Sequence, residues 1–126
     1  MMDYLLVMIG GGIGAGLRHA ANVHLPRLLG SGFPFATLAV NVIGSLLMGL
    51  FVGWLARQAG GAGAGLRLFL ATGILGGFTT FSAFSLDTVL LWERGDTALA
   101  LLYALASVLV SVLALAAGLA LVRAAG

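Results

Sequence analysis

Residues 73–85 read Gly73-Ile74-Leu75-Gly76-Gly77-Phe78-Thr79-Thr80-Phe81-Ser82-Ala83-Phe84-Ser85, and they lie in the middle of a long apolar segment. Paired glycines followed by two β-branched threonines are poor material for an unbroken helix. A break inside a membrane exposes carbonyls at one half-helix end and amide hydrogens at the next, so it survives only where it lines a cavity or binds an ion. We therefore predict a helix broken near Gly76 to Thr80, with Thr79 or Thr80 capping its second half.

The composition of the whole chain indicates that its solvent is a lipid bilayer. Of the 126 residues, 61% are hydrophobic and 8% are charged, against roughly 25% charged in an ordinary soluble domain. The absence of Cys excludes disulfides, thiolate metal sites and a cysteine nucleophile. No base, nucleophile and orienting group converge in this sequence, so we expect neither an enzyme nor a nucleic-acid partner.

Four apolar segments account for most of the chain. They run from Tyr4 to about Val23, from Phe35 to Leu55, from Leu68 to Leu91 and from Thr97 to Val122. The connections contain Pro26 and the run Gly30 to Pro34, then the glycine-rich linker Gly60 to Gly65, then the charged patch Trp92 to Asp96. At about 20 residues per span, this predicts an all-α membrane protein, one domain over residues 1–126 with four transmembrane helices per subunit.

The arginines predict how such a chain would insert. With four spans, Arg18, Arg27 and Arg94 fall on one side of the membrane, and Arg57, Arg67 and Arg123 fall on the other. Orientation follows the excess of Lys and Arg in cytoplasmic loops, so a balanced count gives no preferred orientation. We expect insertion both ways and an antiparallel, dual-topology homodimer, although a short sequence can also reach this balance by chance.

Two stripes of polar residues run along otherwise apolar segments. The second segment carries Thr37, Asn41 and Ser45, and the fourth carries Tyr103, Ser107 and Ser111, each spaced by four. Residues four apart share a helix face, and an amide facing lipid would lose its water without compensation. The stripes favour one lined pathway. The alternative is structural: serines bonding their own helix and an asparagine joining two helices.

Three further residues stand out in the apolar segments. Phe81 and Phe84 share a face after the predicted break, where packing is the ordinary role of an aromatic and a positive ring edge toward a small anion is the specific one. Arg18 lies close to the membrane interface, as an anchor or in a vestibule. Asp87 is the only acid inside a span, either interfacial or a partner of Arg18.

Over nearly its whole length the sequence resembles the Fluc (CrcB) family of fluoride channels. The resemblance rests on three runs of sequence: Gly11 to Arg18 in the first segment, Thr37 to Ser45 in the second and Gly76 to Phe84 in the third. Ala83 stands where the motif often has Thr, and His19 follows Arg18 where Tyr is common.

The resemblance implies a dual-topology homodimer with two antiparallel fluoride pores, a broken third helix and a central structural Na⁺. By motif, Asn41 would bind fluoride and Phe81 and Phe84 would present ring edges to it. The remaining pathway residues are expected to be Thr80, Ser107, Ser111, Tyr103 and Thr37. The backbone carbonyls of Gly76 and Thr79 from both subunits would hold Na⁺ at the dimer interface.

The expected function is passive, fluoride-selective export from the cytoplasm through a bacterial-type plasma (inner) membrane, which confers fluoride resistance. A small four-helix, dual-topology exporter of drugs or other cations is the alternative. Such an exporter needs a membrane-embedded carboxylate, and the first segment has none. A third possibility, a structural or assembly protein of the membrane, would need no polar stripes.

Overall fold

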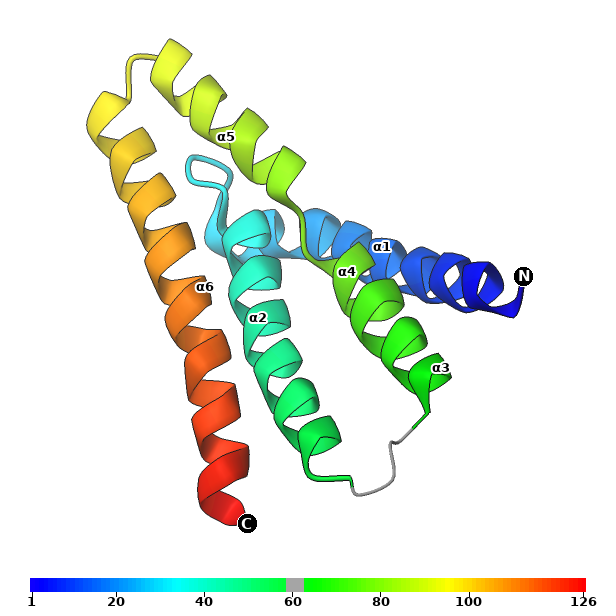
Figure 1. Ribbon diagram of the computed structural model, residues 1–126. Helices are drawn as coiled ribbons and strands as arrows, with labels where there is room; N and C mark the ends of the chain where they lie inside the picture. The colour runs from blue at the N-terminus through cyan, green and yellow to red at the C-terminus, as the bar shows by residue number, and fades with distance from the viewer. Residues whose placement is uncertain (59–62) are drawn as a thin grey trace.

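The computed structural model describes residues 1–58 and 63–126, and within them the chain is all-helical, without a strand. The elements are α1 (Met2–Leu29), α2 (Phe35–Ala56), α3 (Ala64–Arg67), the π-helix η1 (Leu68–Leu75), α4 (Gly76–Phe78), α5 (Phe81–Glu93) and α6 (Thr97–Ala125). Figure 1 shows α2 and α6 side by side, with α1 lying across the run from α3 to α4. The predicted all-α class is confirmed.

The third apolar segment is broken, as predicted. Thr79 (φ −84°, ψ 160°) and Thr80 (φ −154°, ψ 125°) are extended and separate α4 from α5. Thr80 is the cap of the second half, because its Oγ1 accepts a hydrogen bond from the Ala83 amide at 3.1 Å. Gly76 to Phe78 remain helical, so the threonines interrupt the helix and the glycines do not.

Two connections differ from the prediction. Pro26 lies inside α1 instead of ending it, although it has no N–H to donate to the carbonyl four residues earlier. The helix ends at Gly30, whose φ of 90° suits glycine and whose amide donates to the Pro26 carbonyl at 2.8 Å. The third segment begins at Ala64, four residues earlier than expected. That start lies within the predicted linker Gly60 to Gly65, of which residues 60–62 fall outside the described residues.

Three helical segments in the described residues are long and apolar enough to span a membrane: Phe35–Ala56, Ala64–Glu93 taken across its break, and Thr97–Ala125. The four-span prediction is therefore only partly supported. α1 has 28 residues, but Arg18, His19 and its many glycines lower its hydropathy.

Glycines set the distances between the packed helices. A methyl group at Gly49 would collide with the Leu115 carbonyl oxygen of α6, and one at Gly14 would collide with the Ile74 carbonyl oxygen of η1. At Gly10 the same group would lie 2.6 Å from the Phe69 carbonyl oxygen. α1 and α2 therefore meet their neighbours backbone to backbone, as small residues permit in membrane helices.

We predict that Gly14→Ala destabilises the fold and that Gly12→Ala on the same helix does not. The Gly14 methyl meets backbone atoms that cannot move aside, whereas nothing lies within 4 Å of a methyl at Gly12. Overpacking costs about 1–3 kcal/mol, while Gly→Ala in a helix otherwise gains up to about 1 kcal/mol. Thermal unfolding in detergent should separate the two variants, and equal midpoints would contradict the packing of α1 described above.

Candidate functional site

A cavity of about 370 Å³ lies where the break meets α2 and α6. Its walls include six residues of the predicted pathway: Asn41, Thr80, Phe81, Phe84, Ser107 and Ser111. The other lining residues are Gly44, Ser45, Met48, Thr79, Val108, Val112 and Leu115. Two residues of each polar stripe and the break, which are far apart in the sequence, thus meet around one space.

Asn41 joins α2 to the break through two hydrogen bonds. Its Nδ2 donates to the Thr80 carbonyl at 3.0 Å, and its Oδ1 accepts from the Thr80 amide at 2.7 Å. The structural role left open by the sequence is therefore present. An asparagine amide has two N–H groups, and Thr80 uses one, which leaves a second donor at the wall of the cavity.

Two serines of α6 carry the least satisfied polar groups near the cavity. The hydroxyl oxygens of Ser107 and Ser111 are buried and have no hydrogen-bond partner among the described residues. Both residues line the cavity. Buried polar groups are rarely left unpaired, so these hydroxyls are suited to hydrogen-bonding a polar or anionic ligand in the cavity.

Aromatic rings form one side of the cavity. The ring centroids of Phe81 and Phe84 are 5.4 Å apart, and Phe84 lies the same distance from Tyr103. Phe81 is 76% exposed, which is unusual for an aromatic side chain that lines a cavity. The described residues therefore leave most of the Phe81 side chain uncovered.

Tyr103 and Thr37 do not line this cavity. Tyr103 is fully buried, and its hydroxyl donates to Asp87 Oδ2 at 3.2 Å, with Thr37 and Ser107 nearby. Asp87 is thus paired with Tyr103 and not with Arg18. Thr37 and Asp87 line a second cavity of about 510 Å³. Tyr103 stands between the two cavities, in contact with residues of both.

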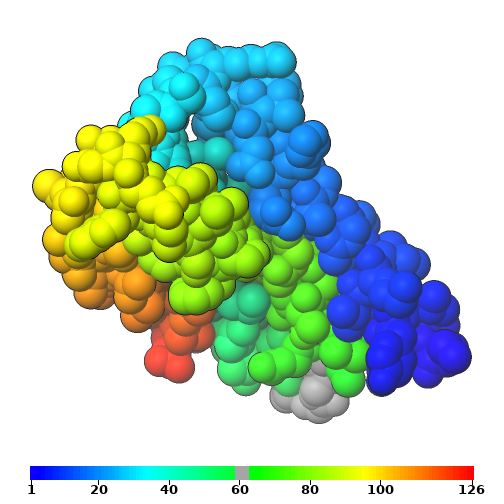
Figure 2. Space-filling view, turned by 90° about the horizontal axis from the view of Figure 1, so that it is seen from above, coloured from blue at the N-terminus to red at the C-terminus, as the bar shows by residue number. Residues whose placement is uncertain are grey.

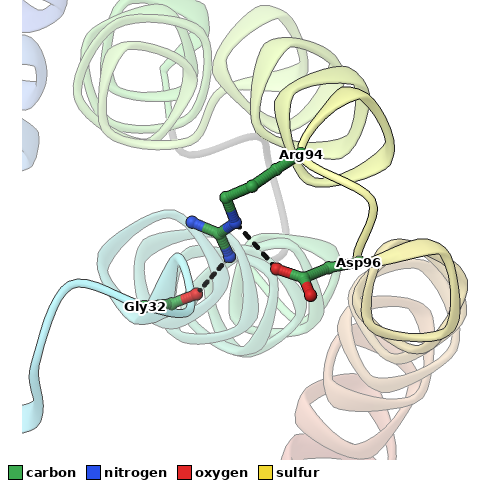
Figure 3. Close-up of polar contacts among 3 residues, drawn as sticks. All are labelled: Gly32, Arg94 and Asp96. Atoms are coloured by element: carbon green, nitrogen blue, oxygen red, sulfur yellow. Dashed lines mark hydrogen bonds and ion pairs between the residues drawn. The ribbon is translucent and has the colours of Figure 1, made fainter.

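Arg94 lines the second cavity, and its side chain is half-exposed. Its Nε donates to Asp96 Oδ2 at 2.7 Å and its Nη2 donates to the Gly32 carbonyl at 2.9 Å, which ties the α5–α6 loop to the α1–α2 loop (Figure 3). Seen from above, the surface is hollowed between the cyan segment around residue 32 and yellow-green α5 (Figure 2).

The break changes the partners of two backbone amides. In a continuous α-helix the Thr80 amide would bond the Gly76 carbonyl, and the Ala83 amide would bond the Thr79 carbonyl. Here the Thr80 amide donates to Asn41, and the Ala83 amide donates to the Thr80 hydroxyl. The carbonyls of Gly76 and Thr79, the two predicted cation ligands, have therefore lost their regular helical donors.

Arg18 reaches the same break from α1. Its Nε donates to the Gly77 carbonyl at 3.1 Å, and the side chain is half-buried. Sequence reasoning placed Arg18 near the interface but missed this contact. It also missed the pairing of Asp87 with Tyr103 and the position of Arg94. Asp87, an isolated acid in an apolar segment, was the one residue whose position indicated a buried partner. The partners themselves lie on other helices, so the sequence did not identify them.

Comparison with known proteins gives a consistent result. Residues 5–119 match the family described as "CrcB-like protein, Camphor Resistance (CrcB)". The chain is 58% identical to "Fluoride-specific ion channel FluC 2" of Nitrobacter hamburgensis, over 97% of this chain and 98% of that protein. It is 56% identical to "Fluoride-specific ion channel FluC" of Mesorhizobium japonicum and 53% identical to the protein of that name from Agrobacterium fabrum, each over 98% of both chains.

Proposed function

The chain belongs to the CrcB-like family, and from that premise we propose that it is a fluoride-selective, passive ion channel that exports fluoride from the cytoplasm and confers fluoride resistance. Its relatives are named as ion channels and not as enzymes. Fluoride enters an acid-stressed cell as neutral HF and ionises inside. A passive pore for the anion is then enough to remove it, and no fuel is needed.

The observation that carries this proposal is the cavity beside the break, with its unpaired hydrogen-bond donors. Fluoride is small and strongly hydrated, so a pore must replace its water with donors. The second Asn41 N–H and the hydroxyls of Ser107 and Ser111 are available there. None of these groups carries a full charge, so binding is weak enough for the ion to leave, as conduction requires.

The aromatic rings and Tyr103 extend this path. Phe81 and Phe84 would turn their positive ring edges to fluoride in a space with few polar groups. From Ser107 the path would pass Tyr103 and Thr37 into the second cavity, which Arg94 also lines. Thr80 completes the polar wall at the break.

We infer that the working unit is an antiparallel homodimer of four-span subunits in a bacterial-type plasma (inner) membrane. Phe81 lines the cavity and is largely exposed, and a second copy would cover it there. The Arg balance between the two membrane sides supports dual topology. α1 would be the fourth span, with Arg18 satisfied by protein instead of facing lipid.

We also propose a structural Na⁺ at the dimer interface. The residues present fit such an ion, because the Gly76 and Thr79 carbonyls lack their regular helical donors, and hard cations favour oxygen ligands. Two carbonyls from each of two subunits would give four oxygens. The ion would offset the cost of leaving these carbonyls in an apolar environment.

The exporter of drugs or other cations is the less favoured alternative. Proton-coupled export needs a free carboxylate in the membrane, whereas the one acid inside a span, Asp87, accepts a hydrogen bond from Tyr103. A purely structural membrane protein would not need buried, unpaired hydroxyls beside a cavity. The names of the relatives favour neither alternative.

We predict that liposomes containing the protein release fluoride, measured with a fluoride electrode, and that Ser111→Ala slows the release. The variant removes one oxygen that makes no hydrogen bond to the described residues. The loss should be about five-fold, since a hydrogen bond contributes about 1 kcal/mol. Phe81→Ile and Phe84→Ile keep most of the apolar volume but remove the ring edges, and at least one of them should reduce release severely.

Ser85→Ala is the matched control for these variants. Ser85 lies on α5 beside Phe84 but lines neither of the two cavities described above. Size-exclusion chromatography should show all variants assembled like the parent. Parental release rates in every pathway variant would refute the pathway, and a parent protein that releases no fluoride would refute the proposed function.

The proposed cation predicts a dependence of release on Na⁺. Replacing Na⁺ on both sides with a large organic cation should lower the rate, because the Gly76 and Thr79 carbonyls would lose their ligand. Restoring Na⁺ should restore the rate. Unchanged release after prolonged exchange into the organic cation would contradict a sodium ion at the break.

Dual topology predicts that a reporter fused to the C-terminus is found on both sides of the membrane. Adding two arginines beside Arg123 should shift the population to one orientation, because the Arg count would then favour one side. Protease accessibility in intact and permeabilised cells measures the two populations. A parent protein found on a single side would contradict dual insertion.

A further inference from the structure

The contact between Arg18 and the break joins residues that are 59 positions apart in the sequence. The Arg18 Nε donates to the Gly77 carbonyl at 3.1 Å, across the contact between α1 and α4. The approach is close because a methyl group at Gly77 would collide with the Gly11 carbonyl oxygen. The α1 backbone therefore lies directly against α4. Arg18 follows Gly14 by about one helical turn on α1.

The Gly77 carbonyl needs a donor from outside its own helix. In a continuous α-helix its donor would be the Phe81 amide. Thr79 and Thr80 are extended, so Phe81 begins the next helix, α5. A carbonyl left unpaired in the membrane is costly. A guanidinium is a strong donor, and its charge complements the partial negative charge at a helix C-terminus.

We propose that Arg18 is a positioning residue that fixes the carbonyl end of the first half-helix and so orients the Gly76 and Thr79 carbonyls. Asn41 holds Thr80 from the side of α2, and Arg18 holds Gly77 from the side of α1. The break is thereby fastened on both sides of Thr79. The expected effect on fluoride release rests on the proposed function, but the effect on the break does not.

Hydrogen exchange of the purified full-length protein, read by mass spectrometry, tests the proposal. In Arg18→Gln the amides of Thr79 and Thr80 should exchange about ten-fold faster or more, because a hydrogen bond from a charged donor is lost. Amides of α6 should exchange at parental rates. Arg27→Gln is the matched control, since it makes the same substitution on the same helix, at an exposed residue in the last turn of α1.

Two results would overturn the proposal. One is unchanged exchange at Thr79 and Thr80 in Arg18→Gln, which would leave Arg18 as an anchor or a source of charge only. The other is equal acceleration at the break and in α6, which would mean general destabilisation. If Arg18→Gln does not fold, Arg18→Lys replaces it. The more strongly hydrated ammonium should give a smaller acceleration, about three-fold, at the same two amides, and parental exchange in that variant would overturn the proposal.

Fluoride release from liposomes is the second measurement. Arg18→Gln should slow release several-fold while Arg27→Gln leaves it at the parental rate. Altered exchange at the break with parental release would overturn the link between Arg18 and conduction. A parent protein without release would refute the proposed function instead, while the exchange measurement would still decide whether Arg18 positions the break.

Discussion

The constraint on which this structure depends is the need to provide hydrogen-bond partners for the backbone groups at a break within an apolar helical segment. Thr79 and Thr80 leave the helix, and each freed amide or carbonyl in hydrocarbon costs several kcal/mol. Side chains from the first two helices meet that cost. Asn41 bonds both backbone groups of Thr80, and Arg18 bonds the Gly77 carbonyl. The glycine contacts bring the α1 backbone against η1 and α4, and Arg18 bonds the Gly77 carbonyl from this position.

The same break creates the chemistry of the site. Partners that hold the threonines also draw two amides away from the Gly76 and Thr79 carbonyls. Beside them lie two serine hydroxyls that have no hydrogen-bond partner in the described part of the chain, and the largely exposed ring of Phe81. In the proposed channel the same residues would therefore serve both structure and binding, and Asn41 is the clearest example. One of its N–H groups holds the Thr80 carbonyl, and in the proposed channel the other would be available to an ion.

Much of this was accessible from the sequence, because composition and local preference act over short distances. The apolar spans, the break and its threonine cap follow from hydropathy and helix propensity, and the polar stripes follow from a spacing of four. The path of α1 through Pro26 was not accessible, since a proline usually interrupts a helix outside its first turn. The π-helix Leu68–Leu75 has no compositional signature. Contacts between helices, such as Arg18 with Gly77 or Tyr103 with Asp87, depend on packing that no local pattern encodes.

The direction of the two long-range contacts at the break has a consequence for biogenesis. Asn41 and Arg18 precede their backbone partners by 39 and 59 residues. Because synthesis proceeds from the N-terminus, both side chains have been made before the threonines leave the ribosome. The break therefore enters a membrane in which its partners can already be present. A permuted chain that began with the third helix would expose the same groups to lipid until the first two helices followed, and it should be a poor substrate for the insertion machinery.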